Sequence, residues 1–277
     1  MNTLKNQTIF ITGASRGIGR QIAIACARQG ANVVIAAKSD TPHPKLPGTI
    51  HTVAEEVRAA GGQALPLVLD VRDEKQIKQR IDEAAEHFGG LDALINNAGA
   101  IRLTGVENLK ISRFDLMHQV NARAVLACSQ AALPWLKKTG RGHILSMSPP
   151  LNLDPKWFAQ FGPYTSTKYA MTMISIGMAQ EFRRYGIAVN TLWPKTLIAT
   201  AAIQYEVGGE QLMAQGRTPE IMADATVSIL NRSLDEMTGQ NLIDEDVLRQ
   251  DGVTDFERYR YIAGDKPLLP DLYLDQP

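Results

Sequence analysis

Short runs of β-branched and other apolar residues alternate with segments of helical period along most of this chain, and no other feature restricts its fold as strongly. Parallel strands need a crossover connection, usually a helix, and strands buried on both faces read as nearly continuous apolar runs. We therefore expect an α/β fold of three αβα layers, in which helices cover both faces of a Rossmann-type, doubly wound parallel sheet.

The expected strands and helices follow each other in the order that such a sheet requires. Strand-like segments occur at 8–12, 32–37, 64–70, 91–99, 142–148, 187–194 and 239–245. Helical period is found at 19–30, 49–62, 74–90 and 112–140. Glycine closes several of these predicted helices, as is typical of helix ends.

Two regions are irregular: the proline-rich stretch 39–48, and a polar stretch from about 247 to 277 that we interpret as a surface extension. Neither has the composition of a linker that leads to a second core. We expect a single domain over 1–277, with its core at about 6–245 and a small lid at about 196–225. The apolar residues of this lid either line a lipid-like substrate pocket or pack on the body of the domain.

The composition argues against several classes of partner. Lys and Arg number 29 and Asp and Glu number 29, so no net field attracts nucleic acid or an anionic membrane. No apolar run approaches the roughly 18 residues of a membrane-spanning helix, and no secretory signal is found, so we expect a soluble, unprocessed protein. Cys26 and Cys128 both lie in apolar helical patterns, which favours buried thiols and a reducing, cytoplasmic setting.

The first strand is followed by TGASRGIGR, in which Gly13, Gly17 and Gly19 are spaced as GxxxGxG. A strand that turns through glycines into a helix lets the backbone approach a pyrophosphate, whose charge is favoured by the free N–H groups at the helix start. The alternative is a merely structural turn. The position of the loop inside a βαβ unit favours a dinucleotide cofactor.

Two further strand ends carry polar residues. Asp70 ends its strand at the edge where open α/β sheets bind ligands, and it is also placed to cap the next helix. The sequence NNAG at 96–99 is interpreted either as a turn or as a wall of the cofactor cleft, because Asn and Gly both tolerate unusual backbone angles.

The end of the second strand predicts which cofactor is bound. An acid there binds the adenosine ribose and repels a 2′-phosphate, whereas basic residues accept that phosphate. Here Ala37 stands at the acid position and Lys38 follows it, with Arg16 in the glycine loop as a second cation. We therefore predict NADP(H). The alternative is that both cations point to solvent, with Asp40 weakening their field.

Tyr164 and Lys168 lie four residues apart in YTSTK, and therefore on one face if the segment is helical. A phenol beside an ammonium group can exchange a proton near neutral pH. Taken alone, this spacing also fits an ordinary surface pair.

These features occur together and in order with Asn121, a serine-bearing strand end at 146–148 and a strand that ends at Pro194. The combination resembles the short-chain dehydrogenase/reductase family over roughly residues 6–245. The longer stretches SMSPPLNLDPKWF, LWPKTLIAT and GQNLIDEDVL resemble its hydroxysteroid-dehydrogenase-like branch. The resemblance implies an oxidoreductase that moves hydride between the nicotinamide and a small-molecule secondary alcohol or ketone, assembled as a homodimer or homotetramer. We assign no metal ligands.

The resemblance also implies roles for individual residues. Tyr164 is the general acid/base, Lys168 is its pKa partner and a ribose ligand, and Asn121 supports a water-linked proton relay. The residues implied at the cofactor are Gly13, Ser15, Arg16, Gly17, Ile18, Gly19, Lys38, Asp70, Val71, Asn97, Ala98, Gly99, Tyr164, Lys168, Pro194 and Thr196.

The sequence departs from the family at the catalytic serine, which normally polarises the substrate carbonyl. That position falls at Pro149, and Ser148 immediately precedes it. Successive strand residues point to opposite faces, so Ser148 takes the role only if the Pro-Pro turn rotates it inward. Ser146 and Asn152 are the next polar groups behind it.

Further departures affect the nicotinamide side. The glycine that usually follows the strand proline is Lys195 here, so the threonine that contacts the carboxamide is either Thr196 or Thr200. The sequence DED at 244–246 replaces a glycine pair found in many members.

Two other functions remain open on the sequence. The first is an NADP(H) sensor or scaffold with little or no turnover, in which the serine site has decayed. The second is a non-redox lyase or epimerase that uses the same tyrosine. The presence of Tyr164, Lys168 and Asn121 argues against the sensor or scaffold, whereas nothing in the sequence excludes the lyase or epimerase. For the oxidoreductase, an apolar or lipid-like substrate is one option.

Overall fold

The expected strands form one parallel, seven-stranded sheet in the order β3-β2-β1-β4-β5-β6-β7. The computed structural model describes residues 3–44 and 46–274. The strands are β1 (Thr8–Thr12), β2 (Asn32–Ala37), β3 (Gln63–Val68), β4 (Ala93–Asn96), β5 (His143–Ser146), β6 (Ala188–Trp193) and β7 (Asn241–Ile243). The strand order reverses between β1 and β4, and ligands of open α/β sheets bind at the carboxyl edge of such a switch point.

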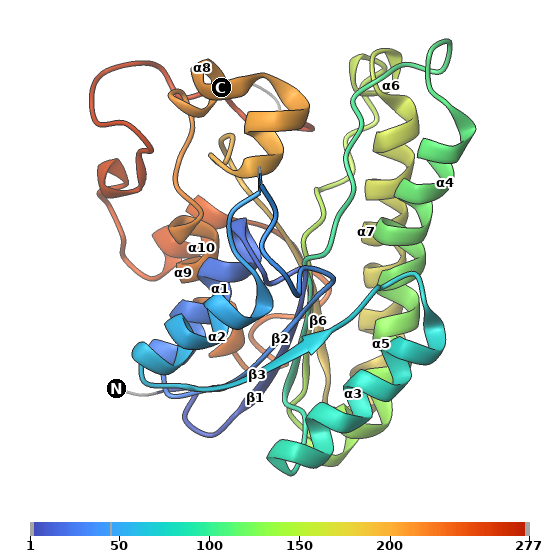
Figure 1. Cartoon of the computed structure of the whole chain (residues 1–277), viewed down its shortest axis with the longest axis vertical. Coiled ribbons are helices and arrows are strands. Elements are labelled where there is room, and N and C mark those ends of the chain that lie inside the picture. Colours follow the sequence, from blue (N-terminus) through green and yellow to red (C-terminus); the bar gives the residue numbers. More distant parts are fainter. Residues whose placement is uncertain (1–2, 45, 275–277) are drawn as a thin grey trace.

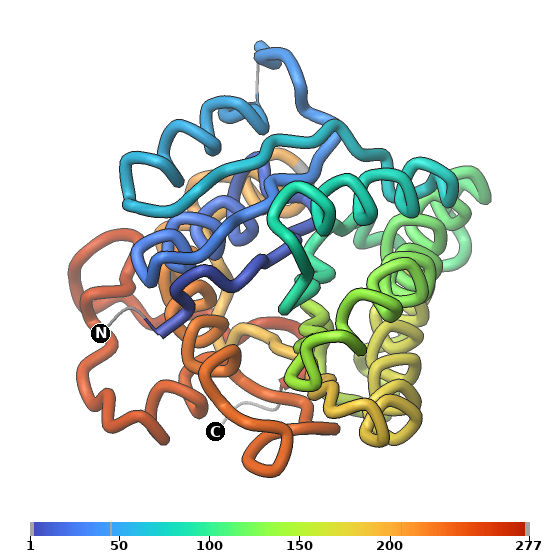
Figure 2. Tube along the Cα trace, turned by 90° about the horizontal axis from the view of Figure 1, so that it is seen from below, coloured from blue at the N-terminus to red at the C-terminus, as the bar shows by residue number. Residues whose placement is uncertain are grey.

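The connections between the strands are mainly helical. The helices are α1 (Gly17–Arg28), α2 (Ile50–Ala59), α3 (Glu74–Phe88), α4 (Ile111–His118), α5 (Ala124–Thr139), α6 (Lys156–Ala159), α7 (Gly162–Phe182), α8 (Gly209–Met213), α9 (Glu220–Leu230) and α10 (Asp244–Gln250). In Figure 1, α1, α2, α9 and α10 cover one face of the sheet, while α3, α4, α5 and α7 cover the other. Figure 2, turned by 90°, shows the same two layers on either side of the strands.

Alternation along each buried strand produces the two hydrophobic cores. Ile9 and Ile11 of β1 pack in the core beneath α1 and α9, whereas Phe10 between them packs in the core beneath α3, α5 and α7. Successive strand residues point to opposite faces, so a strand that is apolar throughout supplies both layers. The expected doubly wound, three-layer fold is confirmed.

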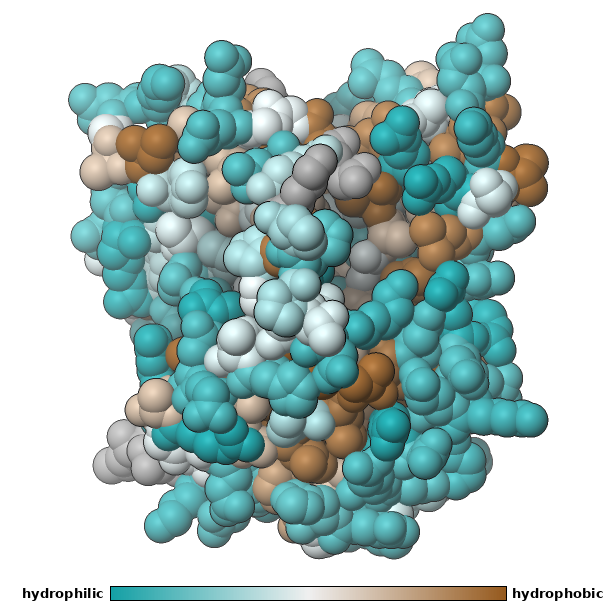
Figure 3. Space-filling view, in the orientation of Figure 1, coloured by the Kyte–Doolittle hydropathy of each residue, from teal (hydrophilic) through white to brown (hydrophobic). Residues whose placement is uncertain are grey.

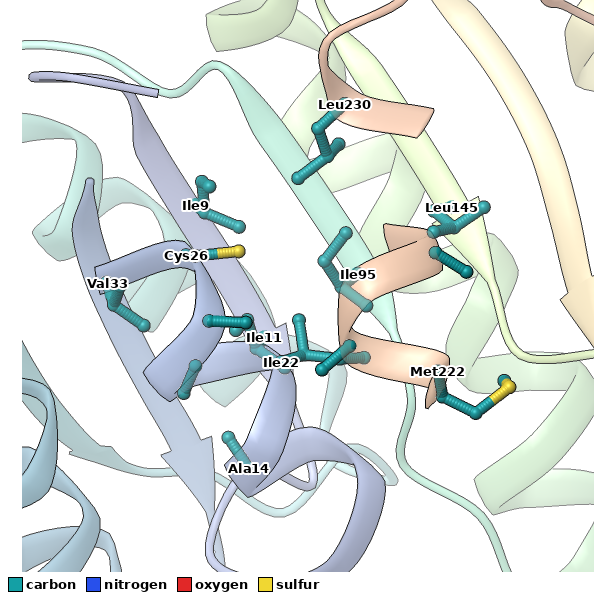
Figure 4. Packing of buried hydrophobic residues seen from close by; sticks show 14 of the residues in the cluster. Ile9, Ile11, Ala14, Ile22, Cys26, Val33, Ile95, Leu145, Met222 and Leu230 are labelled. Carbon is teal, nitrogen blue, oxygen red and sulfur yellow. The ribbon is translucent and has the colours of Figure 1, made fainter. Parts of the chain in front are cut away.

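Part of the predicted lid belongs to the first core. Met222 of α9, and Leu230 on the same helix beyond the predicted lid, belong to one buried cluster with Ile22 and Cys26 of α1. Figure 4 shows these residues beside the strands of the sheet. Ile198 joins the same core. These residues therefore pack on the body, which was one of the two alternatives for the lid.

One expected helix and the expected last strand differ from the structure in their extent. The predicted helix 112–140 is interrupted by a π-helical stretch, Gln119–Arg123, between α4 and α5. The predicted last strand ends at Ile243, because α10 begins at Asp244. Single turns of π-helix inside α-helices are frequent at functional sites.

The stretch from about 247 is not only a surface extension. Val247, Leu248, Phe256 and Tyr259 lie in the core beneath α1 and α9, and Tyr273 is 1% exposed. The polar composition of the stretch concealed these contacts. Residues 275–277 of the predicted extension, and Lys45 of the proline-rich stretch, lie outside the described residues.

On the face shown in Figure 3, hydrophobic side chains form separate areas. The rest of this face is mainly hydrophilic. Within the described residues, no helix is both long enough and apolar enough to cross a membrane.

Candidate active site

The glycine loop after β1 is held by the loop after β4. Thr12 Oγ1 accepts hydrogen bonds from the backbone N–H groups of Asn97 and Ala98, both at 3.0 Å. The Asn97 side-chain amide donates to the main-chain oxygens of Thr12 and Gly13 at 2.9 and 3.1 Å. A Cβ atom at Gly13 would lie 2.8 Å from Ala98 Cα, and one at Gly19 would lie 2.5 Å from the Asn97 amide nitrogen. Both glycines are therefore required for the two loops to meet at the switch point.

The start of α1 has the properties of a phosphate cradle. Arg16 precedes the helix without a side-chain cap, which leaves the N–H groups of the first turn without that acceptor. A Cβ atom at Gly17 would meet only the Thr200 side chain, at 3.6 Å. Ser15 is buried and Ile18 is half-buried in the same turn. An anion can approach the backbone here more closely than a side chain would allow.

The end of β2 lies beside the glycine loop. Ala37 is the last residue of β2, and Lys38 after it is exposed. Arg16 Nη2 donates to Ser39 Oγ at 2.9 Å and to the Gly48 main-chain oxygen at 3.2 Å. Arg16 therefore holds the proline-rich stretch against the glycine loop, with its guanidinium group next to the residue that follows Lys38.

Asp70 lies two residues beyond the end of β3. Arg72 pairs with it, with Nη2 of Arg72 2.5 Å from Oδ2 of Asp70. The hydrogen bond from Arg72 lowers the pKa of Asp70, and the nearby Lys38 lowers it further. The cap of α3 is Asp73, which accepts from two backbone N–H groups of the first turn. The predicted capping role of Asp70 is therefore wrong, because the chain takes three more residues to reach the helix. Val71, which follows it, is buried.

Tyr164 and Lys168 share one face of α7, as their spacing predicts. Each is only 6% exposed. The ammonium group of Lys168 donates to the main-chain oxygen of Met147 at 2.5 Å and lies 5.1 Å from the ring centroid of Trp193. A buried, bonded lysine beside a buried tyrosine is not an ordinary surface pair.

The protonation of this pair differs from what its spacing predicts, which is a tyrosine pKa lowered by the neighbouring ammonium group. Burial raises the pKa of Tyr164 well above its ordinary value, and Tyr273 and Asp271 raise it further. Burial lowers the pKa of Lys168 to about 7, although Asp271 opposes this shift. Desolvation thus outweighs the attraction of the ammonium group for a phenolate. Tyr164 keeps its proton at neutral pH in this arrangement.

Asn121 joins three elements of the site. It lies in the π-helical stretch and is 1% exposed. Its Oδ1 accepts from the backbone N–H group of Ala100 at 2.8 Å, and its Nδ2 donates to the Ala100 oxygen at 3.0 Å. Nδ2 also donates to Thr167 Oγ1 at 2.9 Å. Asn121 therefore fixes the loop that follows Gly99 against the residue before Lys168.

Ser146, the last residue of β5, and Ser148 just beyond it are bonded to the part of α7 that follows Lys168. Ser148 is fully buried and its hydroxyl lies 3.0 Å from that of Thr172, one turn beyond Lys168. Ser146 bonds in the same way to Ser175, at 3.2 Å. Thr172 lies two helical turns, about 12 Å along the axis, from Tyr164. The bond to Thr172 favours a structural role for Ser148, and its role in polarising a carbonyl stays a prediction.

Asn152 faces a segment far along the chain. Its amide donates to the Tyr273 main-chain oxygen at 3.2 Å, and its own main-chain oxygen accepts from the Tyr169 hydroxyl at 2.6 Å. The longer loop between Pro149 and Tyr164 is thus bonded to residues near 273.

The two departures on the nicotinamide side form one ion cluster. Lys195 Nζ lies 2.9 Å from Glu245 Oε1, and Arg217 Nη1 lies 2.7 Å from Glu245 Oε2. Arg249 pairs with the same carboxylate at 2.7 Å. Asp244 Oδ1 accepts from the Lys195 backbone N–H group at 2.9 Å. Although burial favours the neutral acid, these hydrogen bonds hold the pKa of Glu245 at about 2.

Thr196 fits a polar ligand group. It is 8% exposed, and within the described residues its hydroxyl has no hydrogen-bond partner. A buried hydroxyl of this kind is costly unless something binds it. Pro194, also buried, directs the chain from β6 toward this residue. Together with the cradle at Gly17, this unpaired group fits a nicotinamide dinucleotide, whose carboxamide is a suitable partner for such a hydroxyl.

Sequence reasoning missed the segment 269–273. Thr196 pairs with Pro270 in an antiparallel bridge, and the Trp193 indole donates to the Leu272 main-chain oxygen at 3.0 Å. The Tyr273 ring packs against Trp193 at a centroid distance of 5.9 Å. The only signal was the group of apolar residues in PLLPDLYL, within an otherwise polar stretch.

Comparison with known proteins agrees with this geometry. The model of the short chain dehydrogenase family matches residues 7–207. The chain is 53% identical over 268 residues to hydroxysteroid dehydrogenase-like protein 2 of Danio rerio, covering 97% of this chain and 64% of that protein. It therefore spans somewhat less than two thirds of the length of this relative.

Solved structures agree at the level of the fold. A short chain dehydrogenase from Mycobacterium thermoresistibile superposes with a TM-score of 0.92 at 47% identity, covering 99% of this chain and 97% of that one. A metagenomic short-chain oxidoreductase in complex with NADP gives a TM-score of 0.72 at 25% identity, covering 87% and 97%. The predicted resemblance is confirmed, and the chain belongs to the short-chain dehydrogenase family of oxidoreductases.

Proposed function

We propose that this chain is an NADP(H)-dependent oxidoreductase that interconverts a secondary alcohol and a ketone. The observation that carries the proposal is the buried Tyr164–Lys168 pair on one face of α7, with the Lys168 ammonium group bonded to the main chain just beyond β5. A buried tyrosine with a bonded lysine four residues away has little purpose in packing, but it can move a proton.

The proton and the hydride take separate routes in this reaction. The nicotinamide, when bound, supplies or accepts the hydride. Tyr164 donates its phenolic proton to the carbonyl oxygen as the ketone becomes an alcohol, and it accepts that proton in the reverse direction. The raised pKa of Tyr164, caused mainly by burial, keeps the phenol protonated at neutral pH, as a proton donor must be before the reaction. Lys168 binds the ribose and tunes the tyrosine, and Asn121 supports the relay that resupplies the proton.

The preference for NADP(H) is supported by the end of β2. Ala37 presents no carboxylate to a 2′-phosphate, Lys38 is exposed beside it, and Arg16 reaches Ser39. Charge-assisted hydrogen bonds from the two cations would then reach the phosphate from adjacent turns. The relative that is in complex with NADP agrees with this choice.

An apolar substrate is supported by the surroundings of the tyrosine. Tyr164 packs in a cluster with Met117, Phe161, Tyr169 and Trp193. A substrate that reaches Tyr164 would therefore have apolar and aromatic neighbours, which supports a hydrophobic molecule that carries one reactive oxygen.

The assembly that we propose is a homodimer or homotetramer through the long helices. Leu126 of α5 is 43% exposed, and Met173 and Ile176 of α7 are 63% and 38% exposed. Apolar side chains three residues apart on one helix are typical of a face that a second subunit covers. Cys26 and Cys128 are free and buried, which supports the cytoplasmic setting that we propose.

The experiment is a screen of secondary alcohols and ketones of increasing apolar size with both cofactors. Stoichiometric change in nicotinamide absorbance, faster with NADP(H), is expected. Cofactor binding without turnover across the screen would instead identify a sensor or scaffold. Product formation without any change in the cofactor would identify a lyase or epimerase.

A further inference from the structure

The segment Leu269–Tyr273 is bonded to the residues that follow β6. The Leu269 main-chain oxygen accepts from the Leu197 N–H group at 2.9 Å, and the Asp271 N–H group donates to the Lys195 oxygen at 3.1 Å. The indole of Trp193 donates to the Leu272 oxygen at 3.0 Å. The backbone on each side of Asp271 is therefore fixed to the residues at the end of β6 and just beyond it.

The same segment packs on the catalytic helix. Tyr273 is 1% exposed and lies in one apolar cluster with Tyr164. Its hydroxyl lies 3.3 Å from that of Thr165, the residue after Tyr164. Its ring lies 5.2 Å from the ring of Tyr169, centroid to centroid. The segment is thus a wall of the site and part of the reason why Tyr164 is buried.

Asp271 is the charged residue of this wall. Lys168 and Tyr164 of α7, Asp244 at the start of α10 and Tyr273 of its own segment are the titratable groups that interact with it. Its Oδ1 accepts from the Leu272 N–H group at 2.7 Å. One carboxyl group therefore interacts with both members of the proton-transfer pair, while the family's usual serine position holds Pro149.

We propose that Asp271 is a positioning residue of the active site, carried on the wall segment Leu269–Tyr273, and that its charge shifts the protonation of the Tyr164–Lys168 pair. This inference rests on the proposed function and deepens it. The geometry supports it on two counts: the backbone around Asp271 is bonded to Trp193 and Lys195, and Trp193 itself lies against the Lys168 ammonium group.

The direction of the effect follows from the charges. A carboxylate favours the charged form of a lysine and disfavours a phenolate, so Asp271 raises the pKa of Lys168 and of Tyr164. Burial raises the pKa of Asp271 itself to about 7, with Asp244 adding to the rise and Lys168 opposing it. Its charge is therefore largely absent in acid and present in base. In the profile of kcat against pH, the limb is the fall in rate as the Tyr164–Lys168 pair loses a proton. Removing the carboxylate should move this limb to lower pH. The variant should therefore lose more of its rate above about pH 7 than below it.

The test compares Asp271→Asn with the matched control Asp265→Asn, an exposed acid of the same stretch. Asparagine resembles the neutral carboxylic acid, so the ratio of wild-type to variant kcat should rise as the pH passes 7. The rise should be about tenfold for each pH unit by which the limb moves. Asp271→Glu should return the limb part of the way to its wild-type pH. NADP(H) affinity should stay within about threefold, because the phosphate cradle is not touched. Asp265→Asn should match wild type at every pH.

A second readout needs no turnover. The Lys168 charge lies over the Trp193 ring, so the emission of Trp193 in the ligand-free protein should follow the titration of the pair, with Trp193→Phe as the blank. Its midpoint should fall in Asp271→Asn and stay unchanged in Asp265→Asn. A constant kcat ratio across pH together with an unmoved midpoint would overturn the positioning role. Absence of turnover in wild type and Asp265→Asn would instead refute the proposed function, and the emission titration would then decide this inference alone.

Discussion

The two ends of the proposed cofactor site are built in different ways. The phosphate end consists of the loops after β1, β2 and β4, and its contacts join main-chain atoms, small side chains and glycines. The nicotinamide end combines α7, α10, the residues after β6 and the segment 269–273 through side chains. Backbone-based sites tolerate little change in sequence, whereas sites built from side chains can exchange one set of partners for another.

The exchange is visible at Lys195 and Glu245. Taken separately, a lysine in place of a glycine and an acidic run in place of a glycine pair are two unexplained departures from the family. In the structure they form one ion pair at 2.9 Å, together with Arg217. The departures from the family at the nicotinamide end are therefore coupled. We expect substitutions there to lower stability by leaving a buried charge unpaired. Substitutions at the phosphate end should instead change cofactor binding.

The largest effect is expected from Glu245→Gln. The side chains of Glu245 and Arg217 are 6% and 7% exposed, so the substitution leaves a buried guanidinium group without its carboxylate. We expect the free energy of unfolding to fall by about 3–5 kcal/mol, measured by denaturant unfolding. Glu55→Gln breaks an exposed pair with Arg58 and should cost less than about 1 kcal/mol. Equal losses in the two variants would contradict the proposed difference in burial.

The next effect is expected at the other end, from Lys38→Asp. A carboxylate there should repel the 2′-phosphate and bind the ribose, and the loss of one charged contact should shift the NADP(H)-to-NAD(H) preference by about ten- to a hundredfold. Titration of both cofactors measures this shift. Lys5→Asp, an exposed change before β1, should leave the preference unchanged. Tighter binding of NAD(H) by wild type, or an unchanged preference in Lys38→Asp, would reject the assignment.

The smallest effect is expected from Ser148→Ala. The hydroxyl of Ser148 is bonded to that of Thr172, so its loss should cost about 1 kcal/mol of stability and change kcat by less than about tenfold. Steady-state kinetics on wild type, Ser148→Ala and Ser146→Ala separate this expectation from a catalytic role. A fall in kcat of a hundredfold or more in Ser148→Ala alone would make it the group that polarises the carbonyl.

Predictability from sequence follows the same division. The strands, the glycine loop and the Tyr164–Lys168 spacing could be predicted because each depends on residues close together in the chain. The pairing of Glu245 with Lys195 and the position of Asp271 could not, because they join residues 50 and more apart whose polarity suggested a surface. The neutral state of Tyr164 was also missed, since burial beneath Tyr273 is not visible in the spacing of YxxxK.

Tyr164→Phe tests most directly the claim that the buried tyrosine is the proton donor of a working oxidoreductase. Phenylalanine keeps the ring in the cluster with Trp193 and removes only the hydroxyl. With a ketone identified in the screen, kcat for its reduction should fall by about 10²–10⁴-fold, while NADPH affinity stays within a few fold of wild type. A variant that reduces the ketone at a rate near that of wild type would contradict the account.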